Sequence, residues 1–163
     1  MLRQAHSSLL TDWMIAVISR ILLAGGLAVC FLGTCEAADL KVSVEGLRSN
    51  SGQVLICVFS AEGSDTSQFP DCEKGKPVKT AKAQIAGVKV IMTFNGLKDG
   101  VYAVAIIHDE NANGTLDTNL LGIPTEGVGV STNPRLFGKP KFSDGTFNIS
   151  GNTSISIETK YIL

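Results

Sequence analysis

Short stretches in which apolar and polar residues alternate make up most of the chain after residue 38. Residues 40–47 alternate from one residue to the next, as in a β-strand that buries one of its faces. Residues 53–59 are almost continuously apolar, which is typical of a strand covered on both faces. The same reasoning predicts further strands at 80–85, 88–94, 101–107, 142–149 and 155–157.

Clusters of Gly, Asn and Asp separate these stretches, and no convincing helix is predicted among them. The pattern therefore predicts an all-β fold, a Greek-key β-sandwich of about seven strands. We expect 80–85 and 88–94 to form a tight hairpin around Ala86-Gly87, and Asn95-Gly96 to make the next turn. Residues 122–140 have no clear period, and we interpret them as a long crossover or as a ligand-binding loop.

Residues 97–102 have the form L-x-x-G-x-Y, which resembles the tyrosine corner of Greek-key sandwiches. In that motif a Tyr near the start of a strand donates its hydroxyl hydrogen to a backbone group upstream. We therefore expect Tyr102 to fix the start of the strand 101–107. The alternative is an ordinary hairpin with a tyrosine in the core.

The N-terminal region predicts export. Arg20 precedes an apolar stretch at 21–33, and Ala37 ends a small-x-small sequence of the kind that signal peptidase cleaves. We therefore assign residues 1–37 to a signal peptide, with Met14 as an alternative start. The expected location is the periplasm or the cell exterior.

Two alternatives to a cleaved signal peptide stay open. An uncleaved anchor needs about 20 consecutive apolar residues, whereas Arg20 interrupts this region. Residues 32–35, LGTC, resemble a bacterial lipobox, although Thr34 stands where that pattern has Gly or Ala. Lipid attachment at Cys35 is therefore the less favoured alternative.

Residues 38–163 are expected to form one β-sandwich domain without a stable membrane span. The formal net charge of the chain is -1, so no nucleic-acid footprint is predicted. The domain has two cysteines, Cys57 and Cys72, and export favours a disulfide between them over two reduced thiols. The bridge would hold the long polar loop 60–78 against the preceding strand, with Phe69 as an apolar anchor.

An acidic loop follows the strand 101–107 and has the form D-x-N-x-N-G-x-x-D. Its spacing matches the start of an EF-hand calcium loop, in which a glycine bend turns alternate oxygens toward one Ca²⁺ ion. The expected ligands are the side chains of Asp109, Asn111, Asn113 and Asp117 with the carbonyl of Thr115. Leu120 stands where the motif has a bidentate Glu, so we predict weak binding, with Asn119 or Glu126 available to complete the shell. The alternative is a metal-free loop of Asx-turns.

His108 is the only histidine after residue 37. Nucleophilic catalysis needs a histidine beside a nucleophile and an orienting acid. Ser131 and Asp109 are present, but no G-x-S-x-G motif accompanies them. We therefore predict that the protein is not an enzyme and that His108 has a structural role. The basic residues Arg135, Lys139 and Lys141 are interpreted as part of a solvated loop.

The longest specific stretch is GLKDGVYAVAIIHDENANGTLDTNLLGIPTEGVGVSTN, followed by FGKPKFSDGTFNI. It resembles the DUF2141 family of exported bacterial proteins, over about residues 40–157, most specifically in HDENANGTLDTN, GIPTEG and FGKPKFSD. The L-x-x-G-x-Y corner gives a further resemblance to transthyretin-like and Cna-B-like sandwiches. The resemblance implies export and a β-sandwich but no activity. Where the family has an aromatic residue after GIPTEG, this chain has Val128.

Two functions follow from these observations. The first is an exported, non-enzymatic β-sandwich that acts in binding or envelope interaction and carries a weak structural calcium loop. The alternative is an accessory domain that binds a small molecule or a carbohydrate through the acidic loop and the 122–140 loop. The expected partner is an unknown protein or small-molecule ligand, without nucleic acid. A concave pocket lined by aromatic residues would favour the alternative, and a flat sandwich would favour the first function.

Overall fold

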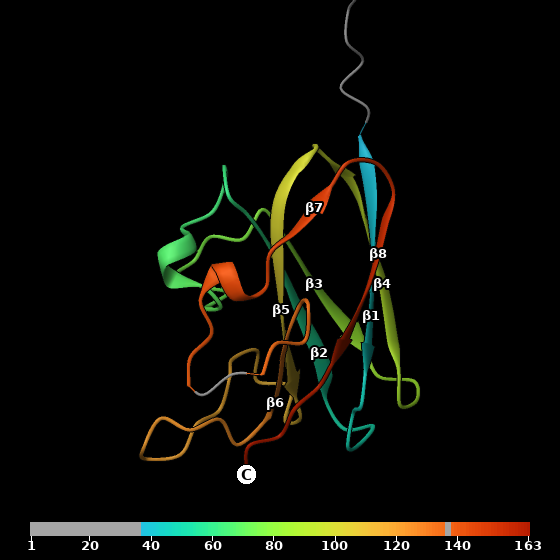
Figure 1. Cartoon of the computed structure of the whole chain (residues 1–163). Coiled ribbons are helices and arrows are strands. Elements are labelled where there is room, and N and C mark those ends of the chain that lie inside the picture. The colour runs from blue at the N-terminus through green and yellow to red at the C-terminus, as the bar shows by residue number, and fades with distance from the viewer. Residues whose placement is uncertain (1–36, 136–137) are drawn as a thin grey trace, which may run out of the picture. The chain divides into compact units, whose positions relative to one another are not determined.

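The computed structural model describes residues 37–135 and 138–163, which form eight β-strands in two facing sheets (Figure 1). The all-β sandwich predicted from the sequence is confirmed. The predicted signal peptide falls outside the described residues except for Ala37, and so does the alternative lipid-attachment site at Cys35. Within the described part of the chain, no helix is long and apolar enough to cross a membrane.

The smaller sheet, called sheet A, has the order β4-β1-β8, and β1 and β8 run parallel. Its strands are β1 (Ala38–Glu45), β4 (Val90–Leu97) and β8 (Thr153–Glu158). The larger sheet, called sheet B, has the antiparallel order β3-β2-β5-β6, and a short β7 also pairs with β5. Its strands are β2 (Gln53–Ser60), β3 (Lys79–Gln84), β5 (Gly100–Asp109), β6 (Gly127–Val130) and β7 (Phe147–Ile149). Two 3₁₀ turns lie in the loops, η1 (Thr66–Gln68) and η2 (Phe142–Asp144).

The predicted hairpin between residues 80–85 and 88–94 is wrong. Strand β3 pairs with β2 in sheet B, whereas β4 pairs with β1 in sheet A, so the chain crosses between the sheets around Gly87. The central strands β1 and β2 thereby each pair with a neighbouring strand on both sides. The residues of the turn between β3 and β4 do not indicate this arrangement. Asn95-Gly96 also remains within β4, and the turn to β5 falls at Lys98-Asp99.

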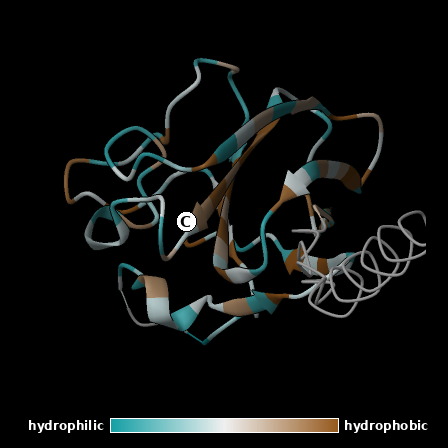
Figure 2. Ribbon diagram, turned by 90° about the horizontal axis from the view of Figure 1, so that it is seen from above, coloured by the Kyte–Doolittle hydropathy of each residue, from teal (hydrophilic) through white to brown (hydrophobic). Residues whose placement is uncertain are grey.

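The core lies between the sheets and is built from alternate residues of the central strands. Val54, Ile56 and Val58 of β2 are fully buried there, together with Val104 of β5 and Val42 of β1. The outer face of β2 is buried as well, so the predicted covering of both faces is confirmed. Loops gather along this outer face of sheet B, on the left in Figure 1 and again in Figure 2. The outer face of sheet A, in contrast, is mainly polar.

Strand β6 is the strand that the sequence pattern did not predict. Its sequence alternates Gly and Val, so glycines occupy one face and hide the apolar period. A Cβ atom on Gly127 would lie 2.5 Å from the Tyr161 ring, and one on Gly129 would lie 2.7 Å from Ile157. Glycine is therefore required on the face over which the C-terminal segment passes. Residue Val128 points to the opposite, outer face, beside Ile107.

The tyrosine corner forms as predicted. The Tyr102 hydroxyl donates a hydrogen bond to the Lys98 carbonyl oxygen, at 2.8 Å, and Tyr102 is buried. Burial raises the pKa of the Tyr102 hydroxyl. The corner fixes the beginning of β5, the strand that leads directly into the acidic loop.

The predicted disulfide between Cys57 and Cys72 is also present, with Cα atoms 5.9 Å apart. It joins the outer face of β2 to the loop 61–78. Phe69 of the same loop is buried and meets Phe59 edge-to-face, with ring centroids 5.0 Å apart. A covalent bond and an apolar anchor therefore fix this loop over sheet B.

Candidate functional site

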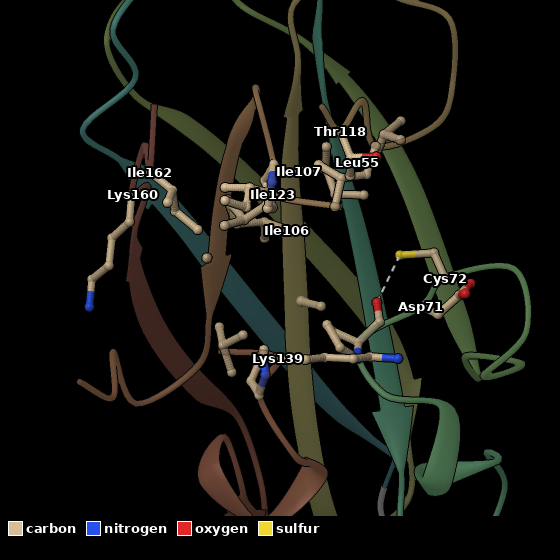
Figure 3. A pocket seen from close by; sticks show the side chains of 18 of the residues that line it. Leu55, Asp71, Cys72, Ile106, Ile107, Thr118, Ile123, Lys139, Lys160 and Ile162 are labelled. Carbon is tan, nitrogen blue, oxygen red and sulfur yellow. Dashed lines mark hydrogen bonds between the residues drawn. The ribbon is translucent and has the colours of Figure 1, made fainter. Parts of the chain in front are cut away.

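A cavity of about 750 Å³ lies on the outer face of sheet B (Figure 3). Its floor consists of side chains from three adjacent strands. Leu55 of β2 pairs with Ile107 of β5, and Ile107 pairs with Val128 of β6, so these side chains lie side by side on one face. Ala105 adds a small side chain to the same floor. The sheet thus presents a continuous aliphatic surface to the cavity.

Three loops and the C-terminal tail form the walls. The loop held by the disulfide contributes Pro70–Glu73, and the loop that follows β5 contributes residues 114–116, 118 and 122–124. The third loop contributes residues 133–134 and 138–140, and the tail contributes Ile162. The two loops that the sequence suggested for ligand binding therefore meet around one cavity.

The lining is aliphatic rather than aromatic. Among the described residues that line the cavity there is no Phe, Tyr or Trp, and Val128 lies in the floor. Prolines from all three loops contribute to the walls, and proline restricts backbone motion. The charged lining residues are Asp71, Glu73, Lys139, Glu158 and Lys160. This lining suits an apolar small molecule better than a carbohydrate.

The acidic loop begins with Asp109, the last residue of β5, which is fully buried. Its carboxylate accepts three hydrogen bonds, from the Gln53 side chain at 2.7 Å and from the backbone N–H groups of Asn113 and Gly114 at 3.0 and 2.8 Å. Gln53 is its neighbour across the β2–β5 ladder. Asp109 therefore closes the loop onto the end of the sheet.

The other predicted ligands converge within the loop. The side-chain amides of Asn111 and Asn113 donate to the two oxygens of Asp117, at 2.6 and 3.0 Å. The Asn113 oxygen accepts the backbone N–H of Thr115. The structure therefore brings the predicted residues together as a network of Asx-turns, with amide nitrogens facing the Asp117 carboxylate. Within the described residues, no group of three or more His, Cys, Asp or Glu is arranged to hold a metal ion.

The two residues considered for completing a calcium shell have other partners. Glu126 is buried, and its two oxygens accept the backbone N–H groups of Glu110 and Asp117, at 2.9 and 3.0 Å. The Asn119 side chain accepts the N–H groups of Leu121 and Ile123. Both side chains thus hold the backbone of the loop in place. Leu120, in the twelfth position, is fully exposed.

His108 belongs to a buried chain of hydrogen bonds. Its Nε2 lies 3.0 Å from the Ser51 carbonyl oxygen, which can only accept, so Nε2 carries the proton. Its Nδ1 then accepts the hydroxyl hydrogen of Tyr161 at 2.6 Å, and that hydroxyl oxygen accepts the backbone N–H of Arg48. The network ties the C-terminal tail to the turn after β1. A structural role for His108 stays a prediction that these hydrogen bonds favour.

Ser131 is engaged elsewhere. Its hydroxyl donates to the Gly145 carbonyl oxygen and accepts the backbone N–H of Val104 at 2.9 Å. The structure therefore does not place Ser131 beside His108, and the arrangement that nucleophilic catalysis would need is not formed by these two side chains.

An ion pair between Arg48 and Glu110 connects the acidic loop to the turn after β1. Arg48 makes two hydrogen bonds to the Glu110 carboxylate, at 3.1 and 2.6 Å, and lies over the Tyr161 ring, 4.4 Å from its centroid. The Arg48 guanidinium holds the pKa of Glu110 below its ordinary value, assisted by the Ser49 hydroxyl. Sequence reasoning missed Arg48, Tyr161 and the role of Glu126, because their partners are far away along the chain and no local motif marks them.

The fold and the cavity together define an all-β sandwich with a loop-walled pocket on one outer face. The sequence pattern of the family described as "Uncharacterized protein conserved in bacteria (DUF2141)" matches residues 42–157, and the chain belongs to that family. Comparisons with curated proteins and with solved structures found no match. The family resemblance expected from the sequence is confirmed, and the resemblance to transthyretin-like and Cna-B-like sandwiches stays a prediction.

Proposed function

We propose that this protein is an exported, non-enzymatic binding module whose cavity on sheet B takes a small apolar ligand. The observation that carries the proposal is the aliphatic floor formed by Leu55, Ile107 and Val128 beneath a cavity of about 750 Å³. Ligand sites commonly have volumes of about 300–1,000 Å³ and mostly apolar linings.

Two further features support a preformed site. The disulfide fixes the wall that contains Pro70–Glu73, and the hydrogen bonds of Asp109 and Glu126 fix the wall formed by the acidic loop. Rigid walls lower the entropy cost of binding because little has to be ordered when the ligand arrives. Export is supported by the predicted signal peptide, and a disulfide suits an oxidising compartment.

The test of this function is the thermal stability of the protein with the neutral apolar probe 1-decanol. Ligand that binds only the folded state raises its melting temperature. We expect a rise for the protein as it is and a much smaller rise for Val128→Trp, because the indole would fill the cavity floor. Ile91→Trp is the matched control, since Ile91 is exposed on β4 of the opposite sheet. Equal responses in all three proteins, or no response, would refute the proposal.

We also propose that the acidic loop takes a weakly bound structural Ca²⁺ ion. Support comes from the convergence of Asn111 and Asn113 on Asp117, because turning the two amide groups would direct oxygen atoms toward the same point. A hundredfold excess of Ca²⁺ over its dissociation constant would stabilise the fold by about 2.7 kcal/mol. We expect a calcium-dependent melting temperature that Asp117→Asn abolishes and that Asp99→Asn, in the β4–β5 turn, leaves intact. No shift at millimolar Ca²⁺ would eliminate the calcium proposal.

A further inference from the structure

The cavity has chemically different ends. In Figure 3, Ile107 and Ile123 lie together at one end of the cavity, and Lys139 lies at the other. A ligand that fills the cavity would therefore meet aliphatic side chains along most of its length and an ammonium group at one end. This difference between the two ends specifies the ligand more closely than the apolar ligand proposed above, and the inference rests on that proposed function.

The positive charge belongs to one wall. Lys139 lies in the loop that contributes residues 133–134 and 138–140, and the Lys160 ammonium donates to the Pro134 carbonyl oxygen of the same wall at 3.1 Å. Within the described residues, the Lys139 ammonium has no salt-bridge partner, in contrast to the lysines that pair with Asp71 and Glu45. Arg135 adds a further exposed cation to this loop. Within the part of the chain that the structure describes, the Lys139 charge of this wall is therefore not neutralised by an ion pair.

The acidic lining residues offset this charge only in part. The Asp71 carboxylate accepts the backbone N–H groups of Glu73 and Lys74, and pairs with the Lys74 ammonium at 3.5 Å. These bonds hold the pKa of Asp71 below its ordinary value. Glu73 and Glu158 are exposed, so solvent and salt screen their charges. Lys139 is thus the group best placed to meet the end of a bound ligand.

We propose that the ligand is a free single-chain amphiphile with an anionic head group, such as a medium-chain carboxylate. The alkyl chain lies on Leu55, Ile107 and Val128, and the head group meets Lys139. Burial of the chain supplies most of the affinity, because apolar area removed from water contributes about 25 cal/mol per Å². The exposed ion pair adds a smaller term that selects the head group.

The test compares decanoate, 1-decanol and decyltrimethylammonium, which differ in the charge of the head group. We expect decanoate to bind about two- to fivefold more tightly than 1-decanol, the ratio that an exposed ion pair contributes, and the cation to bind most weakly. Lys139→Gln should remove the preference, so that decanoate no longer binds more tightly than 1-decanol to this variant. Lys41→Gln is the charge-matched control, because Lys41 is exposed on β1 of sheet A. Added salt should reduce the preference in the unmodified protein.

The outcomes separate the two proposals. If 1-decanol binds but decanoate has no advantage, or if Lys139→Gln keeps that advantage, the head-group inference is overturned while the proposed function stands. If neither probe binds, both are overturned. Association with anionic phospholipid vesicles without binding of monomeric decanoate would also overturn the inference, because the partner would then be a membrane surface.

Discussion

At the scale of single residues, buried polar side chains hold backbone segments in place. Tyr102 bonds to a carbonyl oxygen, Ser131 bonds to one N–H and one carbonyl, and Asp109 and Glu126 accept backbone N–H groups of the acidic loop. Buried polar groups without partners are costly, so each of these side chains is required by the loop or corner that it holds. These hydrogen bonds therefore give the four side chains a structural role.

The corner gives the first prediction at this scale. Tyr102→Phe removes the hydrogen bond to the Lys98 carbonyl and keeps the ring in the core. We expect the free energy of unfolding to fall by about 1 kcal/mol, the usual contribution of such a bond. Urea denaturation measures it, and an unchanged midpoint would show that the bond does not stabilise the fold.

Glu126 gives the second prediction. In Glu126→Gln an amide group replaces one of two oxygens that accept backbone N–H groups, so one part-buried N–H donor loses its partner. We expect a loss of about 1–3 kcal/mol in the free energy of unfolding. Glu158→Gln is the control, because Glu158 is exposed and its removal should change stability little. Equal effects of the two substitutions would contradict the assigned role of Glu126.

At the scale of elements, loops far apart in sequence are joined over one face of sheet B. The disulfide holds the 61–78 loop, and the Arg48–Glu110 pair holds the acidic loop against the turn after β1. These connections fix loops that form walls of the cavity, so the proposed function predicts that loop stability and ligand affinity are coupled.

The disulfide can be tested by removing both cysteines. A bridge that closes a loop of about 15 residues stabilises a fold by about 3 kcal/mol in the chain-entropy model. We expect the Cys57→Ala/Cys72→Ala protein to lose a stability of that order and to bind 1-decanol more weakly, because Cys72 lies in a cavity wall. Calorimetry measures both quantities, and unchanged binding would show that this wall does not depend on the bridge.

The Arg48–Glu110 pair predicts a pH dependence. The pKa of Glu110 is lowered in the folded protein from its ordinary value of 4.5. The pair therefore stabilises the fold above that value, and the stabilisation is lost as the pH falls through the lowered pKa. We expect Arg48→Gln to destabilise the protein more at neutral pH than in acid. In a protein that already carries Glu110→Gln, the Arg48→Gln substitution should destabilise the fold equally at neutral and acid pH. If the pH dependence persists in that background, another group is responsible for it.

At the scale of the whole molecule, the sandwich and its disulfide could be predicted because their signals are local or compositional. Alternation marked most strands, the L-x-x-G-x-Y spacing marked the corner, and two cysteines in a chain predicted to be exported implied one bridge. The assignment of β3 and β4 to different sheets was not predictable from their turn. Strand β6 was hidden because its glycines accommodate Tyr161 and Ile157, residues distant in sequence.

The cavity itself could not be predicted from the sequence, since it arises where three loops meet above one sheet. Alternate residues of β2, β5 and β6 supply its floor only because the registers of the three strands place them together. The sequence indicates a candidate ligand loop at residues 122–140, but it indicates only a structural role for the 61–78 loop. The aliphatic lining then favours an apolar ligand over a carbohydrate.

The most direct test of a ligand site on sheet B is the set of nuclear Overhauser contacts between bound 1-decanol and the protein methyl groups. We expect contacts from the decanol chain to the methyl groups of Leu55, Ile107 and Val128, which line the cavity floor. Contacts confined to exposed methyl groups elsewhere, such as those of Ile91 on sheet A, would contradict it.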